Sequence, residues 1–165
     1  MPTPLPDPEA LLETLVQAVR PDVAPDTAMI GIHTGGAWLA ERLHQLLGLT
    51  VPLGTLDISF YRDDFSKSGL HPRVKPSKIP FEVEGRHILL VDDVLYTGRT
   101  VRGAMNEIFD YGRPDRIHLV VLVDRNERQL PVCAQYCAAR LEVPHGQMLR
   151  LGRDESGRLA FRLDV

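Results

Sequence analysis

Two adjacent carboxylates are the residues of this sequence best suited to chemistry. Asp92 and Asp93 directly follow the apolar run at residues 88–91. A buried strand that ends in two acids carries them to the carboxyl edge of a sheet, where open α/β folds bind their ligands. A strand-to-helix turn with an Asp cap would explain one of these acids, but not the pair.

Small and hydroxylated residues follow the acids at once. Thr97, Gly98, Arg99 and Thr100 can offer successive backbone N–H groups and two hydroxyls to a phosphate, and a helix that begins there adds its positive dipole end. Carboxylates beside a phosphate site would repel a bare anion. They are expected instead to hold ribose hydroxyls or the water shell of a Mg²⁺ that accompanies the phosphates.

The surrounding pattern predicts an α/β fold, an open and mostly parallel sheet with helices on both faces, in a single domain over residues 1–165. Asp7 is expected to cap a first helix, and Gly48 to close a second. Strands are expected at residues 28–32, 53–61, 87–91, 116–123, 147–151 and 159–163. Residues 62–80 are polar and aperiodic, and a loop of that length is usually functional or disordered.

Composition narrows the class of protein. The chain is 44% apolar and 25% charged, as in ordinary globular proteins, and no apolar run approaches the ~20 residues of a membrane span. Residues 1–7 do not resemble a signal peptide, so we expect a cytoplasmic protein without a membrane partner. Two cysteines are too few for a disulfide framework or a zinc site, and the net charge of −3 weakens any general case for nucleic-acid binding.

Residues 91–102 resemble the 5-phosphoribosyl 1-pyrophosphate (PRPP) motif of the type I phosphoribosyltransferases. They are most similar to the version in the bifunctional pyrimidine-operon regulator/uracil phosphoribosyltransferase family. Residues 54–58 with 61–64, residues 111–114 and residues 121–125 also resemble that family. The resemblance implies a type I phosphoribosyltransferase fold with a flexible flap at residues 62–80. It implies a Mg²⁺-dependent transfer from PRPP to uracil that yields UMP and pyrophosphate, performed by a homo-oligomer.

The resemblance also implies a role for each matching residue. Asp92 and Asp93 would act as catalytic residues that hold the ribose, with Mg²⁺ carried beside them by PRPP rather than bound directly by the protein. The other roles are the 5′-phosphate site (Thr97, Gly98, Arg99, Thr100), the pyrophosphate loop (Thr34, Gly35, Gly36), the base site (Tyr96, Val123, Asp124), a catalytic flap cation (Arg62) and further flap cations (Arg73, Lys75, Lys78).

Three departures from relatives refine the expected function. Tyr96 stands where relatives that act on 6-oxopurines usually have Asp, which favours a pyrimidine. Leu15 and Ala18 stand where RNA-binding members carry Arg and His, so we do not expect tight RNA binding. Residues 137–140 differ from the family's Val-Gly-Lys-Asn segment, which helps to shape the base pocket. Two alternatives therefore stay open: a UMP-sensing RNA-binding attenuation regulator with little catalysis, and a phosphoribosyltransferase for another base.

Overall fold

The computed structural model describes residues 4–58 and 77–165. Residues 1–3 and 59–76 lie outside the described part of the chain. Of the expected flap cations, Arg62, Arg73 and Lys75 are therefore outside the description. Lys78 is described, and its backbone pairs with that of Thr55 in an isolated antiparallel bridge beside the edge of the sheet.

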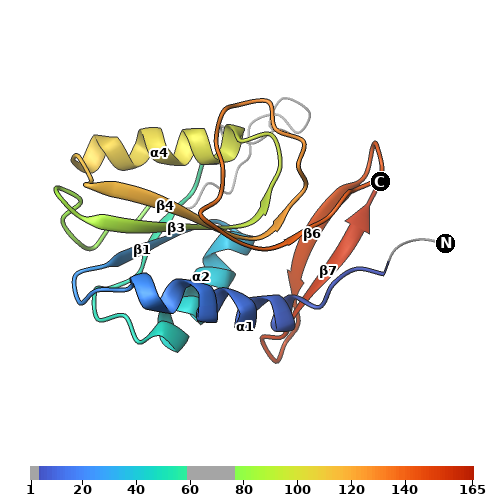
Figure 1. Cartoon of the computed structure of the whole chain (residues 1–165), viewed down its shortest axis with the longest axis horizontal. Coiled ribbons are helices and arrows are strands. Elements are labelled where there is room, and N and C mark those ends of the chain that lie inside the picture. The colour runs from blue at the N-terminus through green and yellow to red at the C-terminus, as the bar shows by residue number, and fades with distance from the viewer. Residues whose placement is uncertain (1–3, 59–76) are drawn as a thin grey trace.

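Helices and strands alternate through most of the chain (Figure 1). The helices are α1 (Pro8–Val19), the short 3₁₀ helix η1 (Arg20–Asp22), α2 (Gly35–Leu47) and α4 (Arg99–Tyr111). The strands are β1 (Ala28–Ile32), β2 (Gly54–Leu56), β3 (His87–Leu95), β4 (Arg116–Asp124), β5 (Tyr136–Arg140), β6 (Met148–Arg153) and β7 (Leu159–Asp164).

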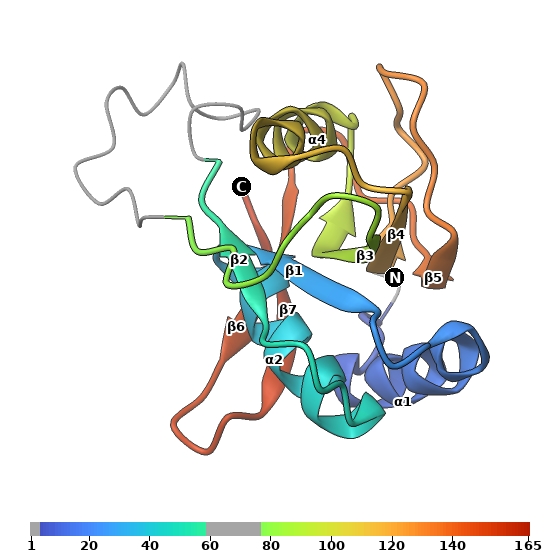
Figure 2. The same ribbon diagram turned by 90° about the vertical axis from the view of Figure 1, so that its left-hand side faces the viewer.

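Five strands form one sheet in the order β2-β1-β3-β4-β5, and every neighbouring pair is parallel. Helix α4 covers one face of this sheet, and α1 and α2 cover the other (Figures 1 and 2). The predicted open parallel sheet with helices on both faces is confirmed. The last two predicted strands also form, but as a separate antiparallel hairpin, β6–β7.

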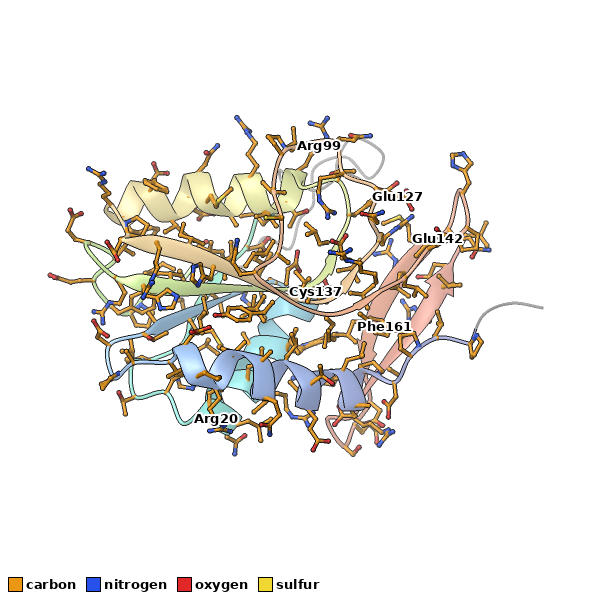
Figure 3. All side chains as sticks on the ribbon, in the orientation of Figure 1. Arg20, Arg99, Glu127, Cys137, Glu142 and Phe161 are labelled. Carbon is orange, nitrogen blue, oxygen red and sulfur yellow. The ribbon has the colours of Figure 1, made fainter. Side chains whose placement is uncertain are left out.

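Alternate residues of the central strands feed two apolar cores. Leu89 and Val91 pack with α1 and α2, whereas Ile88 and Leu90 pack with α4. This alternation follows from the two-residue period of a strand, and it explains why β3 is apolar on both faces. The hairpin joins the first core, since Phe161 of β7 packs against it (Figure 3). The hairpin is thereby fixed beside the carboxyl end of the sheet.

Both predicted helix caps are confirmed. The Asp7 carboxylate accepts a hydrogen bond from the Glu9 backbone N–H at 3.1 Å. Gly48 takes the left-handed conformation, φ 65°, at the end of α2. In the described residues no helix is long and apolar enough to cross a membrane.

Two predicted strand boundaries were wrong. Strand β3 continues past Val91 to Leu95, because β4 pairs with it as far as Asp124. Strand β2 covers only Gly54–Leu56 of the predicted 53–61 within the described residues, because its partner β1 ends at Ile32 opposite Leu56. The two acids thus lie near the end of a central strand, where β4 pairs with it on one side and the pairing with β1 has stopped at Val91, rather than in the loop beyond it.

Candidate active site

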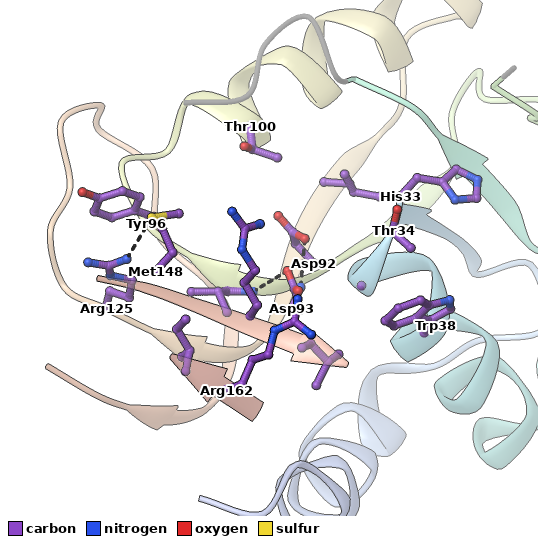
Figure 4. Close-up of a pocket in the computed structure, with 16 residues that line it drawn as sticks. His33, Thr34, Trp38, Asp92, Asp93, Tyr96, Thr100, Arg125, Met148 and Arg162 are labelled. Carbon is purple, nitrogen blue, oxygen red and sulfur yellow. Dashed lines mark hydrogen bonds between the residues drawn. The ribbon is translucent and has the colours of Figure 1, made fainter. Parts of the chain in front are cut away.

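The acid pair lies on the floor of a pocket at the carboxyl end of the sheet (Figure 4). Asp92 is 6% exposed and Asp93 is half-buried. One oxygen of Asp92 accepts the Asp93 backbone N–H at 2.9 Å, and one oxygen of Asp93 accepts that of Val94 at 2.8 Å. These bonds fix both carboxylates against their own backbone and aim them in a defined direction.

The expected phosphate loop turns directly into α4. Gly98 has φ 98°, a conformation that favours glycine, and the Thr97 hydroxyl accepts the Arg99 backbone N–H at 3.2 Å. The first turn of α4 therefore presents backbone N–H groups at the positive end of its dipole. Thr100, in that turn, lines the same pocket as the acid pair.

The segment after β4 supports this loop from behind. The Thr97 carbonyl accepts hydrogen bonds from the backbone N–H groups of Gln129 and Leu130 at 2.9 and 3.0 Å. A Cβ atom on Gly98 would lie 2.6 Å from the Val132 side chain. The loop is thus held in one shape from two sides before any ligand binds.

The expected pyrophosphate loop ends β1 and begins α2, beside the acids. Thr34 and Gly35 line the pocket, whereas Gly36 lies beneath it against the Val91 carbonyl. A Cβ atom on Gly35 would meet the Asp93 carboxylate at 2.2 Å. Glycine at this position is what lets the acid pair and the loop lie in contact.

The predicted base residues fall in two places. Tyr96 lines the pocket. Val123 and Asp124 are not among the described residues that line it. Val123 is fully buried, and the Asp124 carboxylate accepts a hydrogen bond from Arg128 at 2.6 Å. Burial opposes ionisation of Asp124, but the hydrogen bonds from Arg128 and the Asn126 N–H hold its pKa below the ordinary value.

Several pocket residues were not predicted from the sequence. They are His33 and Trp38 beside the glycine loop, Arg125 after β4, and Met148, Arg150 and Arg162 on the hairpin. Figure 4 shows Arg162 reaching toward Asp93, and Tyr96, Arg125 and Met148 gathered at one end of the pocket. Arg125 belongs to residues 121–125, which carry the family resemblance, so the sequence could have indicated it as a site residue. Nothing in the local pattern indicated that the hairpin would fold back over the acids.

Arg150 and Arg162 lie directly opposite each other on the two strands of the hairpin. Both form ion pairs with Asp164, at 3.0 and 3.2 Å. The pocket therefore combines two carboxylates on its floor with guanidinium groups on its wall. Such a lining suits a ligand that carries both hydroxyls and anionic groups.

Comparisons with known proteins agree with this geometry. A family model for the phosphoribosyl transferase domain matches residues 11–141. The chain belongs to the phosphoribosyltransferase family. The Bifunctional protein PyrR of Pseudomonas paraeruginosa is 52% identical over 159 residues, which cover 94% of this chain and 89% of that protein. The protein of the same name from Pseudomonas fluorescens is 48% identical over 151 residues, with coverage of 89% and 90%. The family predicted from residues 91–102 is confirmed.

Solved structures share the fold. A purine phosphoribosyltransferase from Pyrococcus horikoshii aligns with a TM-score of 0.64 and 26% identity, covering 82% of this chain and 83% of that one. A hypoxanthine phosphoribosyltransferase from Staphylococcus aureus gives the same TM-score at 20% identity, with coverage of 84% and 74%. The second likeness concerns the fold alone.

Proposed function

We propose that this protein is a uracil phosphoribosyltransferase, which converts uracil and PRPP into UMP and pyrophosphate. One observation carries the proposal: the acid pair lies between a phosphate loop at the start of α4 and a glycine loop at the start of α2. This arrangement suits a ribose that carries a phosphate at one end and a pyrophosphate at the other. High identity to proteins named Bifunctional protein PyrR supports the proposal.

The roles of the site residues follow from this orientation of PRPP. Asp92 and Asp93 accept hydrogen bonds from the ribose hydroxyls, and the first turn of α4 binds the 5′-phosphate. Thr34 and the backbone of Gly35 receive the departing pyrophosphate. The bond from C1′ to pyrophosphate breaks and a bond from C1′ to the base nitrogen forms, while that nitrogen gives up its proton. The reaction is accelerated by positioning of the two substrates and by stabilisation of the charge on the leaving pyrophosphate, so the chain needs no nucleophile of its own.

The acid pair also fits a magnesium ion that arrives with PRPP. Mg²⁺ is usually held by one or two carboxylates together with substrate phosphates, and Asp92 and Asp93 offer hard oxygen donors beside both phosphate sites. The ion would neutralise charge on the pyrophosphate as it leaves. Among the described residues no group of three or more His, Cys, Asp or Glu side chains could hold a metal alone.

A second candidate function is regulation through RNA, because the similar Pseudomonas proteins are named bifunctional. Leu15, at the position where RNA-binding members are expected to carry Arg, is 1% exposed and packs in the core. It offers an apolar contact to the core and no charge to RNA. We therefore rank RNA binding below catalysis. The expected homo-oligomer and the cytoplasmic location stay predictions.

One assay tests the proposed function. The purified protein is incubated with PRPP, Mg²⁺ and, in separate reactions, uracil, cytosine, hypoxanthine or adenine. We expect UMP and pyrophosphate in equal amounts from uracil, and much slower turnover of the other bases. Preferred turnover of another base, or no nucleotide from any base, contradicts the proposal.

A further inference from the structure

The glycine loop that would receive the pyrophosphate contains no lysine or arginine. Residues 33–36 read His-Thr-Gly-Gly. Pyrophosphate carries several negative charges, and positively charged groups stabilise it as its bond to the ribose breaks. Among the described residues that line the pocket, the lysines and arginines are Arg125, Arg150 and Arg162. Within the described pocket, a side-chain cation for the pyrophosphate therefore has to be one of these three.

Arg125 is already engaged inside the protein. Its side chain is only 3% exposed, and its guanidinium stacks on the Tyr96 ring, 3.9 Å from the ring centroid. One of its terminal nitrogens pairs with Glu127 at 3.1 Å. The side chains of Arg150 and Arg162 are 40% and 66% exposed, so a ligand in the pocket can reach them.

The hairpin that carries these two arginines is fixed to helix α2, which begins at the glycine loop. Arg153 of β6 stacks on the Trp38 ring, 4.8 Å from the ring centroid, and pairs with Glu41 at 3.4 Å. Arg42 of the same helix donates to the Gly157 backbone carbonyl, in the turn of the hairpin, at 3.5 Å. These contacts hold the hairpin against α2, so its arginines have a set position before any ligand binds.

Arg150 and Arg162 form a cationic pair around one carboxylate. They lie directly opposite each other on β6 and β7, where two like charges destabilise a hairpin. Asp164 pairs with both, at 3.0 and 3.2 Å, but it can neutralise only one of the two charges. Figure 4 shows Arg162 reaching toward Asp93, and the carboxylate of Asp93 lies against Gly35. The excess positive charge of the hairpin thus lies on the glycine-loop side of the acid pair.

We propose that Arg150 and Arg162 bind the pyrophosphate of PRPP, as a cationic wall beside the glycine loop. The inference rests on the proposed function and adds two binding residues to it. When PRPP binds, the two guanidinium groups exchange part of their contact with Asp164 for pyrophosphate oxygens, to which a planar guanidinium can donate two parallel N–H bonds. When the bond from C1′ breaks, its electron pair stays with the pyrophosphate, and the arginines stabilise that charge.

A comparison of PRPP with ribose 5-phosphate, which lacks only the pyrophosphate, tests the inference. Isothermal titration calorimetry with Mg²⁺ gives the Kd of each ligand, and of UMP. In Arg150→Gln and in Arg162→Gln, we expect the Kd for PRPP to rise roughly 10- to 100-fold, as for one lost charge-assisted hydrogen bond. The Kd values for ribose 5-phosphate and UMP, and the melting temperature, should not change, because both side chains are partly exposed and face the pyrophosphate alone.

Arg158→Gln is the matched control. Arg158 also belongs to the hairpin region, is 61% exposed and pairs with Asp7, but it is not among the described residues that line the pocket. It should bind all three ligands as wild type does.

An unchanged Kd for PRPP in either pocket variant would overturn the inference. An equal loss of affinity for ribose 5-phosphate would also overturn it, since the arginines would then act on the ribose or the 5′-phosphate, and so would a loss confined to UMP, which would place them at the base. If wild type binds PRPP but does not convert uracil, the proposed function fails, and the comparison of PRPP with ribose 5-phosphate still decides the inference. If wild type does not bind PRPP, both fail.

Discussion

At the scale of single residues, the two glycines of the proposed pyrophosphate loop, Gly35 and Gly36, face different neighbours. A Cβ atom on Gly35 would collide with the tip of the Asp93 side chain, whereas one on Gly36 would lie 2.6 Å from the Val91 backbone carbonyl. A side chain can rotate away, but the backbone of a central strand cannot. Substitutions at these adjacent positions should therefore fail for different reasons.

Gly35→Ala should lower transferase activity by about 10-fold or more, because it displaces a catalytic carboxylate, and it should lower the melting temperature little. Gly36→Ala should instead cost roughly 1–3 kcal/mol of unfolding free energy, as overpacking does. Urea unfolding and initial rates of UMP formation measure the two effects. If both variants lost activity and stability in the same proportion, the assigned contacts would be wrong.

At the scale of elements, the segment from Arg128 to Val132 braces the loop at residues 97–100, the proposed phosphate loop. Arg128 donates to the Tyr96 carbonyl at 3.0 Å, to the Val132 carbonyl at 3.0 Å and to the buried Asp124 carboxylate. One side chain thus joins the end of β4 to the residues that precede the phosphate loop. The brace explains how a loop rich in small residues keeps a fixed shape.

Removing that brace should weaken both folding and PRPP binding. Arg128→Ala leaves Asp124 buried without its cation, which should cost about 2–4 kcal/mol of unfolding free energy. The KM for PRPP should rise more than kcat falls, because the loop loses its preset shape. Arg102→Ala, at an exposed position on α4, is the control and should show neither change. An unchanged KM for PRPP in a stable Arg128→Ala protein would show that the loop needs no brace.

The opposite end of the sheet carries a histidine pair. His87 on β3 and His118 on β4 share a hydrogen bond of 3.2 Å between ring nitrogens. Burial, with Arg116 and His118 nearby, lowers the pKa of His87 below 6.5. The unfolded chain therefore binds more protons than the folded protein just below pH 6.5, so stability falls as pH falls through this window.

His87→Phe removes this proton linkage while it keeps an aromatic ring. Between about pH 7.5 and 5.5, the variant should lose less unfolding free energy than wild type, although it is less stable at the upper pH for want of the hydrogen bond. All other ionisable groups are the same in both proteins, so the difference between the two pH slopes reports on His87. Equal pH slopes in chemical denaturation would contradict the lowered pKa of His87.

At the scale of the whole molecule, local sequence patterns predicted the features that depend on neighbouring residues in the chain. The run of apolar residues before Asp92 predicted the central strand, and the small residues after it predicted the turn into α4. Strand ends depended on partners: β3 runs on to Leu95 because β4 lies beside it. The two strands of the hairpin were predicted, but its position over the acids depends on Leu149 and Phe161, which pack against core residues that are distant in the sequence. The sequence pattern therefore could not predict which hairpin residues line the pocket.

The charge and the first helix bear on regulation by RNA. The chain carries a net charge of −3, and Leu15 is buried where RNA-binding relatives have a cation. Affinity for RNA rises with the number of phosphates neutralised, so we expect a Kd of roughly 1 μM or weaker, without selectivity, for a pyrimidine-leader RNA in the presence of UMP. Filter binding at about 0.15 M salt measures it. Selective binding well below that Kd would favour the regulatory function instead.

The most direct test of the account is the rate of UMP formation by the double variant Asp92→Asn, Asp93→Asn. Asparagine keeps the oxygen that accepts each backbone N–H, so the fold should survive with an unchanged melting temperature. The loss of both charges beside the ribose should lower the rate roughly 10³-fold. A rate near that of wild type, from a protein that melts normally, would contradict the assignment of the acid pair as the centre of the active site.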